Sequence, residues 1–320
     1  MTDFSVIVPL YNKRPHIERA LQSIFAQTLP AREVIIIDDG STDGSRDYVQ
    51  AMDDERVKLI LRNQPGPGGY AARNAGIGAA SGEWIAFLDA DDVWMSGHLR
   101  ALSDAISRVS EPVGCAFSRW EIVEDDKNLP PYIPRDTIAP HVTLSLDDIL
   151  SVWLKDKYCP IWTGVVAIRK TIFETAGLFP EGRALRGGDK DMWLRAIAAG
   201  KSVHTPEVTA EFHQDAVNRV TKRTNHRALP IINSSIADIL ERTPDPHTRR
   251  QLKHIANHEL VNYARFVAGA RQTVPLDFAR SLYMPEGAMD ALKLGAYMAA
   301  GSVLQFTSPS KDRVGAGNVQ

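Results

Sequence analysis

The sequence predicts an α/β protein with a mostly parallel central sheet, followed by a helical C-terminal region. In the first part of the chain, short apolar strands recur about every 25 to 30 residues, with amphipathic helical segments between them. The run Glu33–Ile37 is nearly all β-branched, as expected of a parallel strand buried on both faces. From about residue 226 the apolar residues recur at helical spacing instead.

The elements of the first part follow from apolar periodicity and from helix-start signals. Pro15 fits the first turn of a helix, and Ser41 and Thr42 are expected to cap the helix after the second strand, with Asp43 near its positive end. The expected elements are a strand at 4–9, a helix through Phe25, strands at 33–37 and 57–61, a helix at 70–80 and a strand at 84–88.

The alternation of strand and helix loosens after residue 92. The later expected elements are a strand at 113–123, a loop rich in proline and charge at 125–140, a helix at 146–154 and a strand at 163–168. The expected organisation is an α/β domain over residues 1–220, a helical region over 221–306 and a small, polar, disordered tail over 307–320.

Net charge, cysteine content and apolar runs limit the partners and the location that the sequence predicts. A formal net charge of −2 gives no electrostatic case for nucleic acid as a partner. Cys115 and Cys159 lie among apolar residues and are interpreted as buried hydrophobes. The N-terminus has no signal-peptide pattern, and no run reaches the roughly 18 apolar residues of a spanning helix, so a cytoplasmic location is expected. The apolar segment 292–306 is expected to pack in an interface, with peripheral contact at the inner face of a membrane left open.

The segment Phe87–Asp92 carries the clearest chemical signal. Asp89, Asp91 and Asp92 crowd the end of an apolar strand, and strand ends of α/β sheets are where ligands bind. Like charges this close favour a compensating cation, and a hard divalent ion such as Mg²⁺ or Mn²⁺ prefers oxygen ligands. The alternative is a solvated acidic turn before the next helix.

Two further loops are expected at the same edge of the sheet. Tyr11 follows the first strand and could lie against a ring, and Asp39 follows the second and could accept a hydrogen bond from a base. The third loop, 65–74, formally fits a dinucleotide-binding fingerprint, but that fingerprint belongs after the first strand. We interpret it as a flexible loop before a helix, with Arg73 available to reach a phosphate.

These motifs, taken in order, resemble those of the family 2 glycosyltransferases. The resemblance extends over about the first 215 residues. The segments that carry it are Val6–Asn12, Asp38–Asp43, Ala72–Gly76 and Phe87–Asp92. It implies a GT-A fold and the inverting transfer of a sugar from a nucleotide-diphosphate donor, UDP- or dTDP-activated, with a divalent metal as cofactor.

The resemblance also implies roles for single residues. Pro9, Tyr11 and Asp39 would hold the base and ribose, while Asp89 and Asp91 would address the ribose and the metal-bound diphosphate.

The segment 187–195 resembles the family's Glu-Asp motif, which places Asp189 on the aspartate that serves as general base. Gly188 departs from that motif, since glutamate is usual there. Asp191 is the alternative base and an expected acceptor contact. His213 could reach the metal, and Trp162 could stack on an acceptor sugar; as a strand-edge histidine and a core aromatic, both have ordinary structural explanations.

The expected acceptor is a hydroxyl of a surface glycan, or of a lipid-linked or protein-linked glycan. Two other enzyme classes stay open, a nucleotidyltransferase and an NAD-dependent oxidoreductase that would bind at Gly66–Ala71. A glycosyltransferase-like scaffold without a base is a third alternative, suggested only by Gly188. The C-terminal helices carry no readable motif and could mediate a homodimer.

Overall fold

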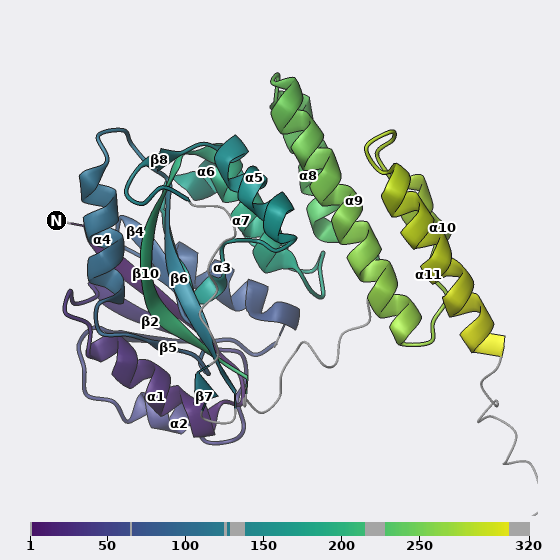
Figure 1. The fold of residues 1–320 in the computed structure, drawn as a ribbon. Helices are drawn as coiled ribbons and strands as arrows, with labels where there is room; N and C mark the ends of the chain where they lie inside the picture. Colours follow the sequence, from purple (N-terminus) through teal and green to yellow (C-terminus); the bar gives the residue numbers. More distant parts are fainter. Residues whose placement is uncertain (1, 65, 125–126, 129–137, 215–227, 307–320) are drawn as a thin grey trace, which may run out of the picture.

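In the computed structural model the chain is described over residues 2–64, 66–124, 127–128, 138–214 and 228–306. One mixed sheet with helices on both faces forms the N-terminal domain, and a group of helices stands to one side of it (Figure 1). The expected α/β architecture and the C-terminal helices are therefore both present. The predicted tail at 307–320 and the boundary near residue 220 lie outside the described residues.

The main path of the sheet runs in the order β3-β2-β1-β4-β9-β6-β10-β5. Its strands are β1 Phe4–Leu10, β2 Glu33–Asp38, β3 Val57–Leu61, β4 Trp84–Phe87, β5 Val93–Trp94, β6 Cys115–Glu124, β9 Val166–Arg169 and β10 Ser202–His213. The first four strands pair in parallel, as predicted. In the expected strand at 163–168, the first three residues form a 3-10 turn, η2 (Thr163–Val165), and β9 then runs antiparallel to both β4 and β6.

The antiparallel β9 has a consequence for function. Because β9 is reversed relative to both of its neighbours, β6 runs in the same direction as β4, and β10 is parallel to β6. The carboxyl ends of β1, β2, β4, β6 and β10 therefore meet at one edge of the sheet. Within the expected loop at 125–140, the described residues include a short strand, β7 (Lys127–Asn128), which pairs with the end of β6. The remaining short strand, β8 (Thr143–Leu144), pairs with the start of β10.

Side-chain alternation along the strands separates two cores. In β1, Ile7 belongs to one core with α3 (Tyr70–Ala79) and α7 (Gly188–Ala199), and Val6 and Val8 belong to the other with α1 (Arg14–Phe25) and α4 (His98–Arg108). All six residues of β2 are buried, as predicted for a strand covered on both faces. The helices of this domain are α1 Arg14–Phe25, α2 Ser45–Gln50, α3 Tyr70–Ala79, α4 His98–Arg108, α5 Leu146–Asp156, α6 Ile172–Ala176 and α7 Gly188–Ala199.

The capping prediction for α2 was wrong in an informative way. The helix begins at Ser45 after Gly44, whose φ is +89°, and its cap residue makes no side-chain hydrogen bond. The Ser41 hydroxyl instead accepts from the backbone N–H of Asn12 at 3.0 Å, and Thr42 N–H donates to Asn12 Oδ1 at 2.8 Å. These bonds join the loop after β1 to the loop after β2 and fix the position of both.

The C-terminal helices are α8 Ile231–Arg242, α9 Pro246–Gly269, α10 Leu276–Arg280 and α11 Ala288–Phe306. Ile232, Ile236 and Leu252, from α8 and the first half of α9, share the core of α5 and α7. The second half of α9 packs with α10 and α11 in a separate cluster around Phe278 and Leu294. The helical region thus continues the N-terminal core before forming its own. Within the described residues, no helix combines the length and apolarity needed to cross a membrane.

Candidate active site

The two aspartates after β2 occupy different environments. Asp38 is fully buried, accepts from Ser41 N–H at 3.2 Å and forms an ion pair with Arg46 at 2.6 Å. Asp39 is also buried, and its backbone N–H donates to Leu10 O at 2.8 Å, which binds the loop to the end of β1. Asp38 is therefore a structural residue of the turn, whereas Asp39 stands at the edge of the sheet.

The carboxylate of Asp39 is incompletely compensated. Its Oδ1 lies 3.2 Å from Arg62 Nε, and its Oδ2 accepts a long hydrogen bond of 3.5 Å from Gly66 N–H. Burial raises the pKa of Asp39, and the charge of Arg62 only partly offsets this. The Asp39 carboxylate can therefore still accept a hydrogen bond from a ligand.

Pro9 and Tyr11 border the same position. Tyr11 is 47% exposed, and Pro9 is partly exposed. Gly68 and Gly69 have φ of +68° and +64°, a conformation that glycine adopts without strain, and a Cβ on Gly69 would lie 3.5 Å from Pro9 Cβ. The glycine-rich loop thus packs against the end of β1 and then starts α3.

Arg73 connects that loop to the acidic segment. The buried guanidinium donates from Nη1 to Gly68 O at 2.7 Å and forms an ion pair with Asp89 through Nη2. Its Cζ lies 5.6 Å from the centre of the Phe179 ring. Burial lowers the pKa of Arg73, but Asp89 and then Asp189 raise it by more, so both acids act on this one cation.

The three acids after β4 differ in accessibility. Asp89 and Asp91 are partly exposed, and Asp91 Oδ2 lies 2.7 Å from Lys13 Nζ. Asp92 is buried and accepts from His213 N–H at 3.0 Å, which attaches the end of β10. Burial, followed by the charges of Asp91 and Asp89, raises the pKa of Asp92 well above its ordinary value. The segment thus carries three carboxylates, and a further cation would stabilise their charge. Its two accessible carboxylates offer the oxygen ligands that Mg²⁺ and Mn²⁺ prefer.

His213 contacts this cluster through its backbone. Its ring is buried, with Nε2 placed 2.9 Å from Glu211 Oε2. The ring of His213 therefore pairs within β10, and no contact of the ring with the acidic segment is seen among the described residues.

Asp189 stands in the first turn of α7, which begins at Gly188 after Gly187 (φ +74°), and its side chain is partly exposed. The sequence did not single out Tyr70, whose hydroxyl accepts from Gly188 N–H at 2.9 Å. Burial raises the pKa of Tyr70, and the charge of Asp189 raises it further.

The same tyrosine explains the departure at Gly188. A Cβ there would lie 2.7 Å from Tyr70 Cζ and 2.6 Å from Pro180 Cγ, so two rings fill the space that a larger residue would need. The only sequence signal for Tyr70 is its place directly after two glycines, at the start of α3.

Asp191 does not fit its expected role. Its side chain is buried, with Oδ2 2.8 Å from Arg195 Nη2 and Oδ1 accepting from the Ser235 hydroxyl at 2.5 Å. These bonds tie α7 to α8. A carboxylate without exposed surface cannot contact an acceptor, so the structure gives Asp191 a structural role in place of the predicted acceptor contact.

Trp162 is partly exposed and lies before η2. Its ring centre is 5.9 Å from that of Trp120 and 5.2 Å from that of Phe212. It therefore belongs to an aromatic group at the ends of β6 and β10, beside the acidic segment.

The family 2 glycosyl transferase model ("Glycosyl transferase family 2") matches residues 5–173. The chain belongs to this family. The matched range contains the motifs around Asp39, Arg73, Asp89 and Asp91, and it ends before α7 and Asp189.

Relatives of this family 2 member match over part of their length. An uncharacterized glycosyltransferase of Nostoc sp. is 35% identical over 175 residues, covering 53% of this chain and 52% of that protein. The GalNAc(5)-diNAcBac-PP-undecaprenol beta-1,3-glucosyltransferase of Campylobacter jejuni is 36% identical over 131 residues, 40% of this chain and 41% of its own. The chain thus spans about half the length, or less, of the curated relatives it matches.

Solved structures establish the GT-A fold of this family 2 member. Residues 1–349 of S. aureus TarS, in complex with UDP-GlcNAc, superpose with a TM-score of 0.70 at 17% identity, covering 97% of this chain and 93% of that one. The mannosyltransferase PcManGT of Pyrobaculum calidifontis, in complex with GDP-Man and Mn²⁺, has a TM-score of 0.52 at 22% identity, covering 96% and 89%. At these identities the likeness concerns the fold.

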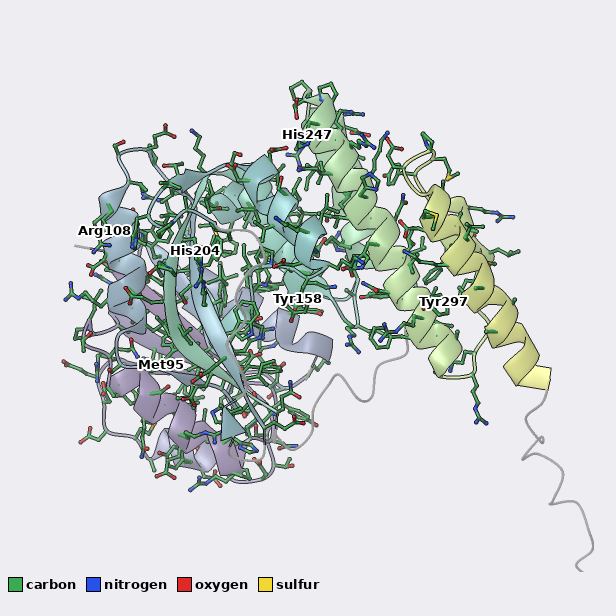
Figure 2. All side chains as sticks on the ribbon, viewed as in Figure 1. Met95, Arg108, Tyr158, His204, His247 and Tyr297 are labelled. Atoms are coloured by element: carbon green, nitrogen blue, oxygen red, sulfur yellow. The ribbon has the colours of Figure 1, made fainter. Side chains whose placement is uncertain are left out.

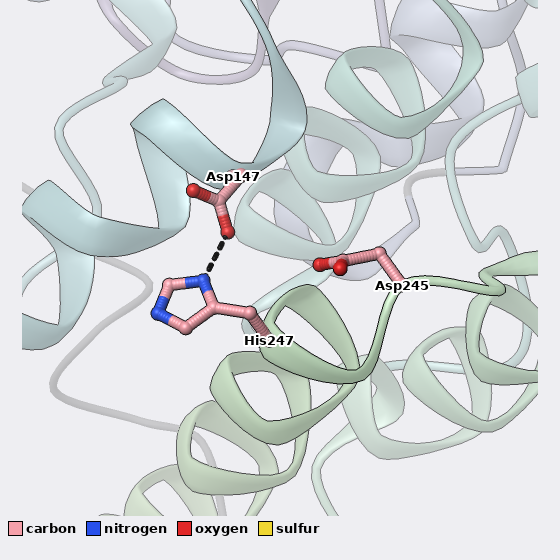
Figure 3. Close-up of side chains that lie close together, drawn as sticks. All are labelled: Asp147, Asp245 and His247. Atoms are coloured by element: carbon pink, nitrogen blue, oxygen red, sulfur yellow. Dashed lines mark hydrogen bonds and ion pairs between the residues drawn. The ribbon is translucent and has the colours of Figure 1, made fainter.

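A second acidic group lies away from this edge. Asp147, Asp245 and His247 have ligand atoms within 4.8 Å of one another, and His247 Nδ1 is 2.7 Å from Asp147 Oδ1 (Figure 3). Asp245 caps α9 by accepting from Thr248 N–H at 2.7 Å, and Thr248 also donates to Asp147 at 3.3 Å. These contacts join the start of α5 to the start of α9 and account for the group as a structural contact.

Proposed function

We propose that this family 2 glycosyltransferase inverts the anomeric centre as it moves a sugar from a UDP- or dTDP-activated donor to a hydroxyl of a glycan acceptor. The observation that carries the proposal is that the first turn of α3 contacts both acidic segments: Arg73 pairs with Asp89 after β4, and Tyr70 accepts from Gly188 N–H beside Asp189 at the start of α7. One acid belongs to the side where a diphosphate would leave, and the other to the side from which an acceptor would attack.

The donor would bind along the loops after β1, β2 and β3. Asp39 would accept a hydrogen bond from the base, since its carboxylate is buried with weak protein support. Tyr11 offers an exposed ring for stacking, and Pro9 forms the floor next to the glycine-rich loop. Arg73 would then face the diphosphate or the transferred sugar.

Asp91 and Asp89 would hold the divalent cation, and His213, whose backbone N–H donates to Asp92, would be a third ligand if its ring left Glu211. Their exposed oxygens and the raised pKa of the adjacent Asp92 fit a hard cation. A bound Mg²⁺ or Mn²⁺ would neutralise charge on the departing diphosphate. Lys13 pairs with Asp91 and Arg73 with Asp89, so a bound divalent ion would share these carboxylates with the two side chains.

Asp189 would act as general base. The acceptor oxygen forms a bond to the anomeric carbon as the bond from that carbon to the diphosphate oxygen breaks, and the hydroxyl proton passes to the Asp189 carboxylate. A single displacement of this kind inverts the centre and needs one base. The backbone bond from Gly188 to Tyr70 holds the first turn of α7, and with it Asp189, in place.

The acceptor we favour is a lipid-linked glycan in surface polysaccharide synthesis. The Campylobacter relative is named for an undecaprenol-linked acceptor, which supports this choice, and we propose that the chain works at the inner face of a membrane. Met289 and Leu292 leave apolar surface exposed on α11, where a membrane or a second copy of the chain could bind.

Calorimetric binding of UDP, dTDP, GDP and NAD, each with and without Mn²⁺, tests the proposal. We expect one pyrimidine diphosphate to bind with Mn²⁺, and Asp91→Ala to remove the metal-dependent part of its affinity. Asp147→Ala is the matched control, because it removes an acid from the other acidic group and should leave binding unchanged. Metal-independent NAD binding, or the absence of nucleotide binding, would overturn the donor assignment.

A further inference from the structure

The long helix α9 reaches the turn of α7 that carries Asp189. It stands beside the N-terminal domain, and side chains fill the space between the two (Figure 2). Glu259 and Tyr263 lie four residues apart on α9, so they project from the same face of the helix. Both side chains bind residues on either side of Asp189.

Glu259 binds the residue that follows Asp189. Its buried carboxylate accepts a hydrogen bond from Lys190 Nζ at 2.6 Å. Burial lowers the pKa of Lys190, but the charge of Glu259 and this hydrogen bond raise it by more. A buried carboxylate that lost its partner would cost stability, so the ion pair holds α9 against the first turn of α7.

Tyr263 binds the residues that precede Asp189. Its hydroxyl donates to Arg186 O at 3.2 Å. The next residue, Gly187, has a φ of +74°, and a Cβ there would lie 2.5 Å from Tyr263 Oη. The tyrosine therefore occupies the space that a side chain at position 187 would need, and the backbone directly before α7 rests against α9.

We propose that Glu259 and Tyr263 are positioning residues, which hold the first turn of α7 so that the Asp189 carboxylate lies where it takes the acceptor proton. This rests on the proposed function, in which Asp189 is the general base. A base must lie within hydrogen-bond reach of its proton, and a displacement of about 1 Å can cost about 10²-fold in rate. The C-terminal helices thus complete the active site.

A double-mutant cycle in the full chain tests the ion pair. The variants are Glu259→Gln, Lys190→Met and the two combined. The assay follows nucleoside diphosphate release from UDP-glucose, UDP-N-acetylglucosamine and dTDP-glucose, with Mn²⁺ and with water or methyl β-D-glucopyranoside as acceptor. Each single change should lower kcat per folded molecule about tenfold and leave the KM of the donor within about twofold.

The combined variant and a conservative one separate positioning from a loss of folding. The combined variant leaves no unpaired charge, and it should lose no more kcat than either single change, because the pair acts as one unit. Lys190→Arg keeps the ion pair and should keep most of the wild-type kcat.

Hydrogen exchange locates the effect in the structure. The amides of residues 187–193 should exchange faster in Glu259→Gln and in Tyr263→Phe, while those of α4 keep their wild-type rate. Tyr263→Phe removes the hydroxyl that binds Arg186 O but keeps the ring, so we expect a smaller fall in kcat, about threefold.

Glu286→Gln is the matched control, because Glu286 pairs with another lysine of α9, Lys253, at 3.1 Å, and joins α9 to the segment before α11. It should change neither kcat nor the exchange of residues 187–193. If Glu259→Gln leaves either quantity at the wild-type value, the positioning role is overturned and the donor assignment stands. If the wild-type chain releases diphosphate from none of the three donors, the proposed function itself is overturned.

Discussion

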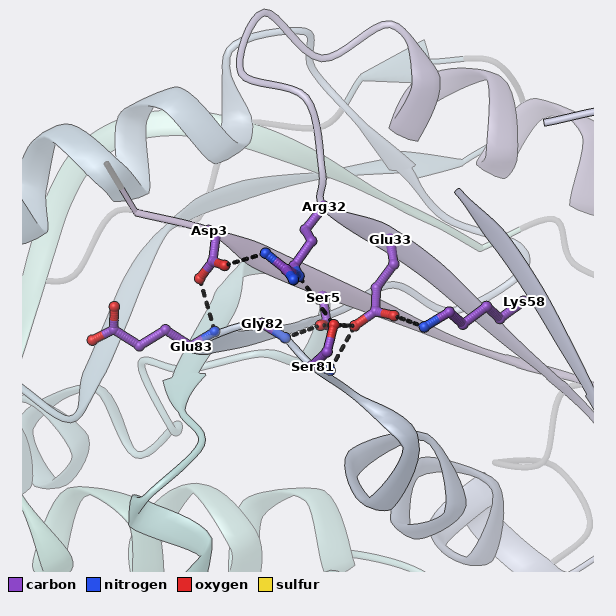
Figure 4. Close-up of polar contacts among 8 residues, drawn as sticks. All are labelled: Asp3, Ser5, Arg32, Glu33, Lys58, Ser81, Gly82 and Glu83. Atoms are coloured by element: carbon purple, nitrogen blue, oxygen red, sulfur yellow. Dashed lines mark hydrogen bonds and ion pairs between the residues drawn. The ribbon is translucent and has the colours of Figure 1, made fainter. Parts of the chain in front are cut away.

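The two edges of the central sheet both carry clustered acids, but the protein surrounds these acids in opposite ways. At the amino edge, buried Glu33 accepts from Ser5 and Ser81 and pairs with Lys58 (Figure 4). Burial alone would raise its pKa, but these hydrogen bonds lower it to about 2. At the carboxyl edge, burial instead raises the pKa of Asp39 and of Asp92. Hydrogen-bond donors of the protein surround the carboxylate of Glu33, whereas those of Asp39 and Asp92 have fewer donors than their burial would require.

This difference separates stability from function. A carboxylate whose lone pairs are all occupied by its own protein has no capacity left for a ligand, and it strengthens the folded state. Under-compensated acids cost stability and are stabilised by an added cation or donor, which is typical of binding sites. Cavity size does not make this distinction. Cavities of about 310 and 350 Å³ open at the amino edge, but the Glu33, Arg56 and Arg169 side chains that line them pair with residues of the chain itself.

The largest effect on chemistry is expected at the carboxyl edge, for Asp189→Asn. An amide cannot take the acceptor proton, so kcat should fall by about 10²- to 10⁴-fold, the range for loss of a general base. The affinity for the nucleotide should stay within about twofold, since the donor loops are untouched. Steady-state release of the nucleoside diphosphate, with a donor of the nucleotide that the binding panel selects and a glycan acceptor, measures kcat, and calorimetry measures the nucleotide affinity.

Asp191→Asn provides the control two residues away. It disturbs the buried contacts with Arg195 and Ser235, so we expect a lower Tm and a kcat per folded molecule close to that of the wild type. If Asp189→Asn keeps more than a tenth of the wild-type kcat, Asp189 is not the base.

The largest change in the free energy of unfolding, in contrast, is expected for a substitution at the amino edge. Glu33→Gln removes a carboxylate whose pKa falls from 4.5 to about 2 on folding, a shift worth roughly 3 kcal/mol at neutral pH. Because the folded pKa is depressed, this contribution is present above pH 4.5 and is lost as the pH falls from about 4.5 toward 2. Urea unfolding at pH 7 and pH 3 should show a large difference between variant and wild type at the first pH and a smaller one at the second.

The same variant should bind UDP and Mn²⁺ like the wild type. An unchanged free energy of unfolding combined with weaker nucleotide binding would reverse the assignment of the two edges.

The sequence predicts the features that depend on residues close together along the chain. The parallel strands were visible in short apolar runs, and parallel strand ends must share an edge, so Asp39, Asp89 and Asp91 could be brought together without a structure. The reversed direction of β9 depends on which strands it pairs with, and its partners begin 82 and 51 residues earlier, at Trp84 and Cys115, than its first residue, Val166. Such pairing leaves no local signature.

Single contacts between distant segments were equally hidden. The bond between Tyr70 and Gly188 spans 118 residues, and the one between Asp191 and Ser235 spans 44. The first explains an unusual glycine and the second removes a candidate acid, so both change how the motif at the start of α7 is interpreted. Neither can be inferred from spacing, because each depends on how helices pack.

A smaller effect on chemistry is expected for Tyr70→Phe. The ring should remain stacked on Phe179, 6.2 Å away, while the N–H of Gly188 loses its partner and the first turn of α7 loosens around Asp189. We expect kcat to fall about tenfold with little change in the KM of the donor, and a loss of about 1 kcal/mol in stability. Kinetics and urea unfolding of the same preparation separate these effects.

Tyr297→Phe, on α11, removes the same atom far from the site and should change neither kcat nor KM. If Tyr70→Phe raised the KM and left kcat unchanged, Tyr70 would act on donor binding and not on the position of Asp189.

The smallest effect is expected for Asp3→Asn, within the network that contains Glu33 (Figure 4). Asp3 pairs with Arg32 at 3.2 Å, but their side chains are 38% and 53% exposed, so solvent competes for both charges. The asparagine keeps an oxygen for the N–H of Glu83, which Asp3 accepts at 2.8 Å. Urea unfolding should therefore show a loss below about 0.5 kcal/mol. A loss as large as that of Glu33→Gln would mean that the network acts as one cooperative unit, and the hydrogen bonds to Glu33 itself would then not be what distinguishes the two edges.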